Sequence, residues 1–295
     1  MMDLLKYKLI YFLLSFLLIL PGVYFLAKDG LKLGIDFTGG VILEYQFQKP
    51  IEVEQLKVSI IGQGAELGQI SQSDNNTYLI KLKPLEQNQI NQLKNDLSEK
   101  YGPIEEKRVE SVGPVIGQEL TKKAILSVLI ASLTIVVYIA YSFRKVPKTT
   151  SSWRFGAAAV VALLHDVLVV VGIFAILGKF FNAEVDTLFV TALLTIIGFS
   201  VHDTIVVFDR IRENLLKNIG RKFSEVANIS VVQTLGRSLN TSLTVVFVLT
   251  ALLLFGGETL RWFVVALLVG VISGTYSSIF NATALLVWWE ERLGH

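Results

Sequence analysis

Residues 188–208 read LFVTALLTIIGFSVHDTIVVF and hold one formally charged side chain, that of Asp203. A helix that crosses a bilayer needs about 20 predominantly apolar residues, so this stretch is long enough to span a membrane. Working outward from it, five more stretches meet the same requirement: 9–27, 125–143, 155–177, 239–255 and 262–289. The sequence therefore predicts a polytopic α-helical membrane protein with six transmembrane helices. The fifth apolar run is short, so its helix is expected to begin before Leu239.

The composition supports a membrane protein with one soluble-looking module. Of 295 residues, 52% are hydrophobic and 18% are charged, whereas a soluble domain carries about 25% charged residues. Residues 28–120 hold 24 charged side chains in 93 positions, and the other 202 positions hold only 28. This excludes a single soluble domain, a disordered chain and a fibrous protein. The net charge of +2 is too balanced to indicate a nucleic-acid partner, and without cysteine there is no disulfide or thiolate site.

Lysine and arginine in the short loops predict the orientation, because cytoplasmic loops carry an excess of both. One side holds Lys6, Lys8, Arg144, Lys145, Lys148, Arg154, Arg210, Arg212, Lys217, Arg221, Lys222, Arg237 and Arg292, and the short loops of the other side hold Lys179 and Arg261. Both termini are therefore predicted to be cytoplasmic. The chain divides into a tail with the first helix (1–27), an extracytoplasmic α+β domain (28–120) and a five-helix membrane domain (121–295). The first span is too long for a signal peptide and lacks an A-x-A site, so it is expected to stay as an anchor.

The module at 28–120 alternates strands and helices. Strands are predicted at 41–48, 66–71, 78–82 and 106–112, helices at 51–61 and 85–101, and a turn at 74–76. Val41, Leu43, Tyr45 and Phe47 fall on one face of the first strand, and Leu85, Gln89, Leu93 and Leu97 stack along the second helix. The order β-α-β-β-α-β predicts a small ferredoxin-like sheet. The module has no histidine and no catalytic constellation, so a binding or mechanical role is favoured.

Ionisable side chains inside the spans are the main functional candidates, since Asp or Arg at a helix centre costs about 2.5–3.5 kcal/mol. Asp203 lies within the fourth span with apolar runs on both sides. Desolvation disfavours its anion, so the carboxyl is suited to be neutral or charged in turn, as a proton relay requires. The alternative is a hydrogen-bonded carboxylate that only joins two helices. Thr204, the next residue, is counted with it in the proton pathway.

Asp166 and Arg237 are the other charged candidates. Asp166 lies near the middle of the third span and is either a second proton site or a structural acceptor. Arg237 precedes the fifth apolar run and is followed by the polar Asn240 and Thr241. Its guanidinium cannot relay a proton, but it can pair with Asp203 and favour the charged carboxylate. The alternative is an anchor that reaches the cytoplasmic headgroups.

Two His-Asp pairs raise the question of a metal or a protease. His165 and His202 each precede an aspartate, but neighbouring side chains in a helix point in different directions, which disfavours a metal site. An intramembrane aspartyl protease is disfavoured because its Gly-x-Gly-Asp context is missing. No metal or other cofactor is therefore predicted.

Small residues recur every four positions in the sixth span, at Ala266, Gly270, Gly274, Ser278 and Ala282. Such a stripe lets two helix backbones approach closely. It predicts a close helix contact but leaves open whether the partner helix belongs to this chain or to another.

Five motifs occur in order along the chain. The first contains Gly34, Asp36, Phe37, Gly39 and Gly40, the second Gly113 and Pro114, the third runs from His202 to Asn214 and contains Asp209 and Arg210, the fourth begins at Arg237, and the fifth contains Gly274, Tyr276 and Ser277. Together with six spans and one outer module, they resemble the protein-export membrane protein SecF of the SecD/SecF family, in the resistance-nodulation-division superfamily.

The resemblance implies an accessory subunit of the Sec protein translocase rather than an enzyme. Such a subunit pairs with a SecD-like subunit and uses the proton-motive force to promote preprotein export across the cytoplasmic (inner) membrane, beside SecYEG. YajC-like and YidC-like membrane proteins are further candidate partners within the lipid bilayer. The family's proton-pathway aspartate falls on Asp203 and its partner arginine on Arg237. His202 stands where many relatives carry a small polar residue such as Asn, so a second titrating group there stays an open question.

Two other functions stay open. One is a small-molecule or lipid exporter of the resistance-nodulation-division type, which is disfavoured because the outer module is small and shows no obvious ligand pocket in its sequence. The other is a passive scaffold of the translocon. The glycines at 34–40 and at 113 either let the outer module shift as the helices move or only make tight turns.

Overall fold

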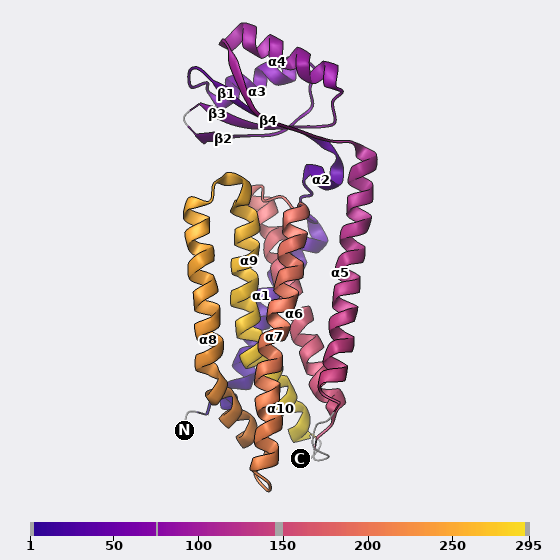
Figure 1. Cartoon of the computed structure of the whole chain (residues 1–295), viewed down its shortest axis with the longest axis vertical. Helices are drawn as coiled ribbons and strands as arrows, with labels where there is room; N and C mark the ends of the chain where they lie inside the picture. Colours follow the sequence, from indigo (N-terminus) through magenta and orange to yellow (C-terminus); the bar gives the residue numbers. More distant parts are fainter. Residues whose placement is uncertain (1–2, 75, 145–149, 293–295) are drawn as a thin grey trace. The chain divides into compact units, whose positions relative to one another are not determined.

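The computed structural model describes residues 3–74, 76–144 and 150–292, in two compact units (Figure 1). One unit comprises Met1–Lys32 and Ser127–His295, and the other comprises Leu33–Leu126. The sequence analysis had bounded the outer module at 28–120. Lys145 and Lys148, which were counted for the orientation, and Asn75 of the expected turn lie outside the described residues.

The unit Leu33–Leu126 is an antiparallel sheet with two long helices on one face (Figure 1). Its elements are α2 (Ile35–Thr38), β1 (Gly40–Phe47), α3 (Val53–Gly62), β2 (Leu67–Asp74), β3 (Thr77–Leu82), α4 (Gln87–Tyr101) and β4 (Ile104–Val112). The strand order β2-β3-β1-β4 is that of a ferredoxin-like sheet. The predicted order of strands and helices is confirmed, and the short helix α2 had not been predicted.

The core of this unit follows the alternation of β1. Val41, Leu43, Tyr45 and Phe47 are all buried and pack against helix residues such as Leu93. One detail of the prediction was wrong, because α4 buries Ile90 rather than Gln89. Gln89 instead accepts a hydrogen bond from the Glu86 backbone N–H at 2.9 Å in a capping box, which turns its side chain toward the helix start.

The Tyr45 hydroxyl gives a first testable prediction. It is fully buried, and among the described residues it has no hydrogen-bond partner. Its cross-strand neighbour Tyr78 donates to the Ile51 carbonyl at 2.5 Å. Because an unsatisfied buried hydroxyl costs about 1–3 kcal/mol, we expect Tyr45→Phe to stabilise this unit and Tyr78→Phe to destabilise it. Hydrogen-exchange protection of β1 and β3 measures both effects, and a loss of protection in Tyr45→Phe would contradict the expectation.

The same hydroxyl predicts a pH dependence. Burial, and next the nearby Glu106 carboxylate, raise the pKa of the Tyr45 phenol above its ordinary value. The folded unit therefore keeps this proton at a pH where the unfolded chain releases it. The stabilisation is intact below about pH 10 and is lost as the pH rises further. Tyr45→Phe should flatten this part of the stability profile.

The other unit consists of long helices. Its elements are η1 (Leu5–Tyr7), α1 (Lys8–Lys28), α5 (Pro114–Ser142), α6 (Ser152–Phe181), α7 (Thr187–Lys217), α8 (Phe223–Phe255), α9 (Glu258–Tyr276), the π-helix η2 (Ser277–Ala282) and α10 (Thr283–Arg292). The helix α5 begins in the unit Leu33–Leu126 and continues into this one. Among the described residues, six helices are long and apolar enough to cross a membrane, the last formed by Thr259–Arg292. The predicted six-helix membrane protein with a small α+β domain is confirmed.

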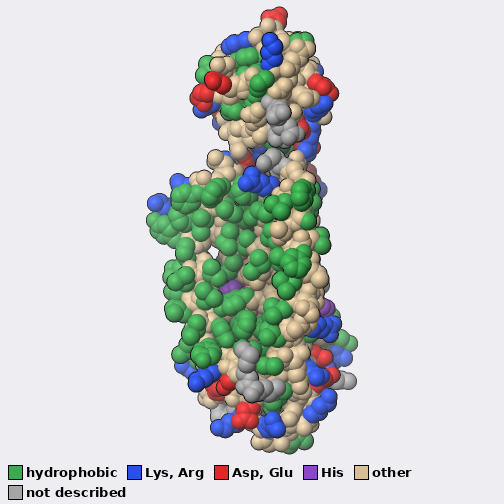
Figure 2. Space-filling view, turned by 90° about the vertical axis from the view of Figure 1, so that its left-hand side faces the viewer, with side chains coloured by type: hydrophobic (Ala, Val, Ile, Leu, Met, Phe, Trp, Pro, Cys, Tyr) green, Lys and Arg blue, Asp and Glu red, His purple; other side chains and the backbone are tan. Residues whose placement is uncertain are grey.

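Side-chain chemistry along the helices fits a bilayer. Hydrophobic side chains cover the middle of the helical unit, and charged side chains gather toward its ends (Figure 2). The helix α8 begins at Phe223, well before the apolar run at 239–255, as the short run had led us to expect. Arg237 is consequently inside a helix rather than at its start.

Helices α1 and α6 meet backbone to backbone at Gly22 and Gly172. A Cβ added to Gly172 would lie 2.8 Å from the Gly22 Cα. We expect Gly172→Ala to force these helices apart and to destabilise the unit by about 1–3 kcal/mol, the usual range for overpacking. Gly198→Ala in α7 is the matched control, because a Cβ there meets nothing within 4 Å. Thermal unfolding in detergent compares the two, and equal melting temperatures would refute the expectation.

The small-residue stripe of α9 packs on α7 of the same chain. A Cβ on Gly270 would collide with Ile196, and one on Gly274 would lie 3.1 Å from the Ser200 Cβ. The stripe therefore brings α9 close to the turn of α7 just before Asp203.

The glycine pair Gly39-Gly40 makes a close turn within the unit Leu33–Leu126. Both residues have positive φ, +76° and +153°, and a Cβ on Gly40 would lie 2.7 Å from the Leu82 carbonyl oxygen. Gly117 at the start of α5 would likewise place a Cβ 2.9 Å from the Phe37 carbonyl oxygen. These glycines allow close backbone contacts, and the suggested shift of the outer module stays a prediction.

Candidate functional site

The three charged candidates lie near the middles of their helices. Asp166 is the 15th of 30 residues in α6, Asp203 the 17th of 31 in α7, and Arg237 the 15th of 33 in α8. None of them is near a helix end, where a long side chain could reach the headgroups easily. Their surroundings within the chain differ sharply, and this difference indicates different roles.

Asp166 is enclosed by hydrogen-bond donors. Its carboxylate is 1% exposed. Oδ2 accepts from the Ser200 hydroxyl at 2.5 Å and from the Ser277 hydroxyl at 2.6 Å, and Oδ1 accepts from the Ser273 hydroxyl at 3.0 Å. The fourth partner is His165, whose Nδ1 lies 2.9 Å from Oδ1. The group ties α6 to α7, α9 and η2.

His165 is a site residue that the sequence analysis missed. Neighbouring side chains were expected to diverge, since successive residues lie about 100° apart around a helix. That expectation was wrong for His165 and Asp166, because the imidazole is long enough to swing back onto the carboxylate. Asn281 donates its amide to His165 Nε2 at 3.2 Å and to the Ser15 hydroxyl at 2.6 Å. Nε2 therefore accepts the hydrogen bond from Asn281, and Nδ1 carries the hydrogen that it donates in the hydrogen bond to Asp166.

Asp203 is buried in a different way. It is 3% exposed, and among the described residues its Oδ2 has no hydrogen-bond partner. Thr204 does not serve it, because the Thr204 hydroxyl donates to the Ser200 carbonyl at 3.1 Å. The basic side chains close enough to act on Asp203 include those of His202 and Arg237.

A polar face of α8 is exposed in the single chain. It consists of Arg237, Asn240, Thr241 and Thr244, and the exposed His202 lies on the neighbouring α7. The ion pairs of the described residues do not include one between Arg237 and Asp203, so that pair stays a prediction. Arg237 directly precedes the apolar run 239–255 of α8. A guanidinium exposed to lipid there is costly, which favours a second surface that covers this face.

The remaining motif residues join α7 to α8 and α9 to α1. Arg210 donates to Gln233 Oε1 at 2.7 Å, while Asp209 pairs with Arg212 at 2.5 Å. The Tyr276 hydroxyl donates to the Tyr11 carbonyl at 2.8 Å. The Arg210 and Tyr276 bonds join different helices, whereas the Asp209–Arg212 ion pair lies within α7.

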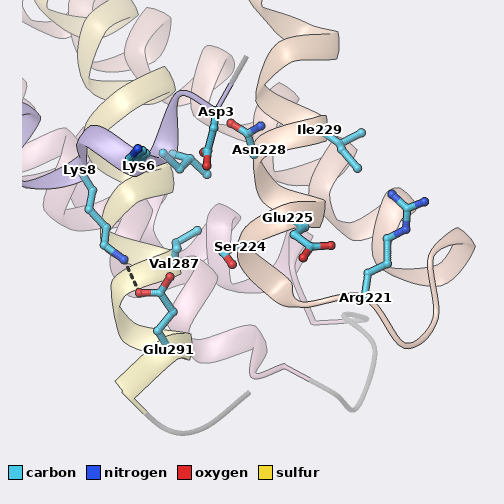
Figure 3. A pocket seen from close by; sticks show the side chains of 11 residues that line it. Asp3, Lys6, Lys8, Arg221, Ser224, Glu225, Asn228, Ile229, Val287 and Glu291 are labelled. Carbon is cyan, nitrogen blue, oxygen red and sulfur yellow. Dashed lines mark hydrogen bonds and ion pairs between the residues drawn. The ribbon is translucent and has the colours of Figure 1, made fainter. Parts of the chain in front are cut away.

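A cavity of about 410 Å³ lies at the end of the helical unit that holds the start of the chain (Figure 3). It is lined by Asp3, Leu5, Lys6, Lys8, Arg221, Ser224, Glu225, Asn228, Ile229, Val287 and Glu291. Lys8 and Glu291 form an ion pair at its edge. None of these residues bonds to Asp166, so the cavity is separate from the buried polar group. Among the described residues, no three His, Asp or Glu side chains are grouped as metal ligands would be.

Two family models match the sequence. "Protein export membrane protein SecD/SecF, C-terminal" matches residues 92–292, and "SecD/SecF GG Motif" matches residues 24–51, which include Gly39-Gly40. The chain belongs to the SecD/SecF family. Within it, the chain is 49% identical over 304 residues to the protein translocase subunit SecF of Thermobaculum terrenum, with 99% of this chain and 95% of the relative covered. The SecF subunit of Anaerolinea thermophila is 43% identical over 300 residues, with the same coverages.

Solved structures of SecDF show the same fold. The crystal structure of SecDF from Thermus thermophilus, which is described as a translocon-associated membrane protein, matches this chain with a TM-score of 0.84 and 34% sequence identity. A SecDF structure in a super-membrane-facing form matches with a TM-score of 0.71 and the same identity. Each match covers 99% of this chain and 39% of the SecDF chain, so this chain corresponds to well under half of that protein. The family membership confirms the resemblance drawn from the five motifs.

Proposed function

We propose that this chain is an accessory subunit of the Sec translocase that pairs with a SecD-like subunit and uses the proton-motive force to promote protein export. The observation that most directly supports this proposal is the exposed polar face of α8 in a chain of the SecD/SecF family. A face with an exposed guanidinium and amide on a membrane-spanning helix favours a protein partner or water, because lipid tails offer these groups no hydrogen bonds. The SecYEG translocon and the exported preprotein follow as further partners, and YajC-like and YidC-like proteins stay candidates.

The partner is expected to be the rest of a SecDF-like unit. The solved SecDF chain is far longer than this one, which covers 39% of it. A SecD-like subunit that supplies the remainder would lie against the α8 face and surround Arg237 with polar groups. That cover would turn an unfavourable exposed charge into a paired one.

Proton coupling is assigned to Asp203. A proton carrier must be able to exist without strong, permanent partners, and the Asp203 Oδ2 has none among the described residues. Arg237 is the partner expected to favour the charged state, with Asn240 and Thr204 as neighbouring polar groups of the pathway. The protein is placed in the cytoplasmic membrane with both termini inside and the outer unit outside, on the strength of the lysine and arginine distribution.

The test is export into sealed vesicles that contain SecYEG, with this chain and a SecD-like subunit added together, singly or not at all. With both present, an imposed proton gradient should increase preprotein export, and an ionophore should remove the increase. A passive scaffold would increase export with or without the gradient. No increase under any condition would favour a small-molecule or lipid exporter and refute the proposal.

A further inference from the structure

Asp166 accepts hydrogen bonds from more helices than a contact between two helices would require. Its four donors come from α6 (His165), α7 (Ser200), α9 (Ser273) and η2 (Ser277), at 2.5–3.0 Å. The three serines are 0–9% exposed, so water does not compete for these bonds. A carboxylate has about four acceptor positions, and all of them are used here.

This arrangement suits a carboxyl group that acts as a hydrogen-bond acceptor at a fixed place. Hydrogen bonds from neutral donors to a carboxylate are stronger than those between neutral groups. A proton on Asp166 would turn one acceptor oxygen into a donor, so at least one of the serine hydroxyls would have to reverse its hydrogen bond and accept instead. His165 faces Asp166 from its own helix, and the groups that face it from α7, α9 and η2 are hydroxyls. Asp203, with its unpartnered oxygen, is the opposite case.

Two of the donors connect Asp166 to the Asp203-bearing helix and to η2. Ser200 lies three residues before Asp203 on α7, and the Thr204 hydroxyl bonds to the Ser200 carbonyl within the same turn. Ser277 is the first residue of η2, a π-helix inserted between α9 and α10. A π-helical turn is rare and depends on outside contacts, and its reversion to an α-helix would shift the following residues by one position, about 100° around the axis.

We propose that Asp166 is a positioning residue that clamps the Asp203-bearing turn of α7 to the π-helical turn η2, so that proton binding at Asp203 is transmitted to α10. His165 and Asn281 hold the far side of the clamp, since Asn281 lies within η2 and bonds both His165 and Ser15. The role of this clamp in transmission rests on the proposed proton coupling. The existence of the clamp can be tested without measuring export.

The first test uses α10 as a reporter. Trp289 in α10 contacts Trp153 at 5.2 Å between ring centroids, so a change in the register of α10 changes its emission. In a Trp262→Phe, Trp288→Phe background the emission comes from the Trp153–Trp289 pair. We expect Asp166→Asn and Ser277→Ala to shift this emission, and Ser277→Thr, which keeps the hydroxyl, to restore it. Ser242→Ala is the matched control, because it removes a buried hydroxyl pair with Thr275 that does not involve Asp166.

The second test is the pH profile of gradient-driven export by the assembled complex. Because coupling between two sites is reciprocal, breaking the clamp must also change the proton affinity of Asp203. We therefore expect Asp166→Asn and Ser200→Ala to lower the export rate about tenfold and to shift the midpoint of the profile in the same direction. A midpoint shifted by Asp166→Asn but not by Ser200→Ala would make Asp166 a proton carrier and overturn the proposal, and so would an unchanged midpoint in both variants. Unchanged emission of the Trp153–Trp289 pair in both Asp166→Asn and Ser277→Ala would also overturn it. If the wild-type complex shows no gradient-driven export, the proposed function fails, while the emission result still decides whether the clamp exists.

Discussion

Asp203→Asn is expected to abolish the increase in export that an imposed proton gradient produces. The buried carboxyl loses the ability to alternate between neutral and charged, and Asn cannot take up or release the proton. A proton that crosses the membrane releases about 2.3 kcal/mol per 100 mV, and this energy reaches the protein only through a group that binds it. Because Asn is neutral and close to Asp in size, insertion and partner binding should be preserved.

The measurement is export into vesicles with the assembled complex, with and without the gradient. Glu213→Gln is the matched control on the same helix, since it makes the same carboxylate-to-amide change at a half-exposed ion pair with Arg210. We expect this control to respond to the gradient like the wild type. A normal response of Asp203→Asn vesicles would make Asp203 a structural residue and remove the proton mechanism.

The spans and the small sheet could be predicted because each depends on a local pattern. Bilayer thickness fixes the length of an apolar run, and the alternation of Val41, Leu43, Tyr45 and Phe47 sets the buried face of β1. The family motifs identified Asp203 and Arg237 without any knowledge of packing.

The surroundings of Asp166 could not be predicted, because they come from residues far apart in the sequence. Ser200 is 34 positions away and Ser277 is 111 positions away. Serines are common in membrane helices, and only the packing of α7 and α9 against α6 turns three of them toward one carboxylate. The π-helix η2 also has no residue pattern of its own, and its wide turn depends on those tertiary contacts. Sequence patterns identify a buried charge, and the fold decides whether that charge is fixed or free to change.

Arg237→Met is expected to lower gradient-driven export at least tenfold, and Arg237→Lys is expected to lower it less. The exposed, mid-helix position of Arg237 requires a polar cover from the partner, and a neutral Met would leave nothing to compensate the charged state of Asp203. Lys keeps the positive charge but loses the planar fork, so it can compensate the charge without the same geometry.

The competing view of Arg237 as a headgroup anchor predicts a different order. An anchor needs only a long cationic side chain, so Arg237→Lys would behave as the wild type, and Arg237→Met would insert poorly or in mixed orientation. Protease accessibility of the outer unit in sealed vesicles measures orientation, and co-purification with the SecD-like subunit measures assembly. Normal orientation and assembly together with lost export in Arg237→Met would assign the guanidinium to coupling. Equal export by Arg237→Met and wild-type vesicles would show that the charge compensation of Asp203 does not depend on Arg237.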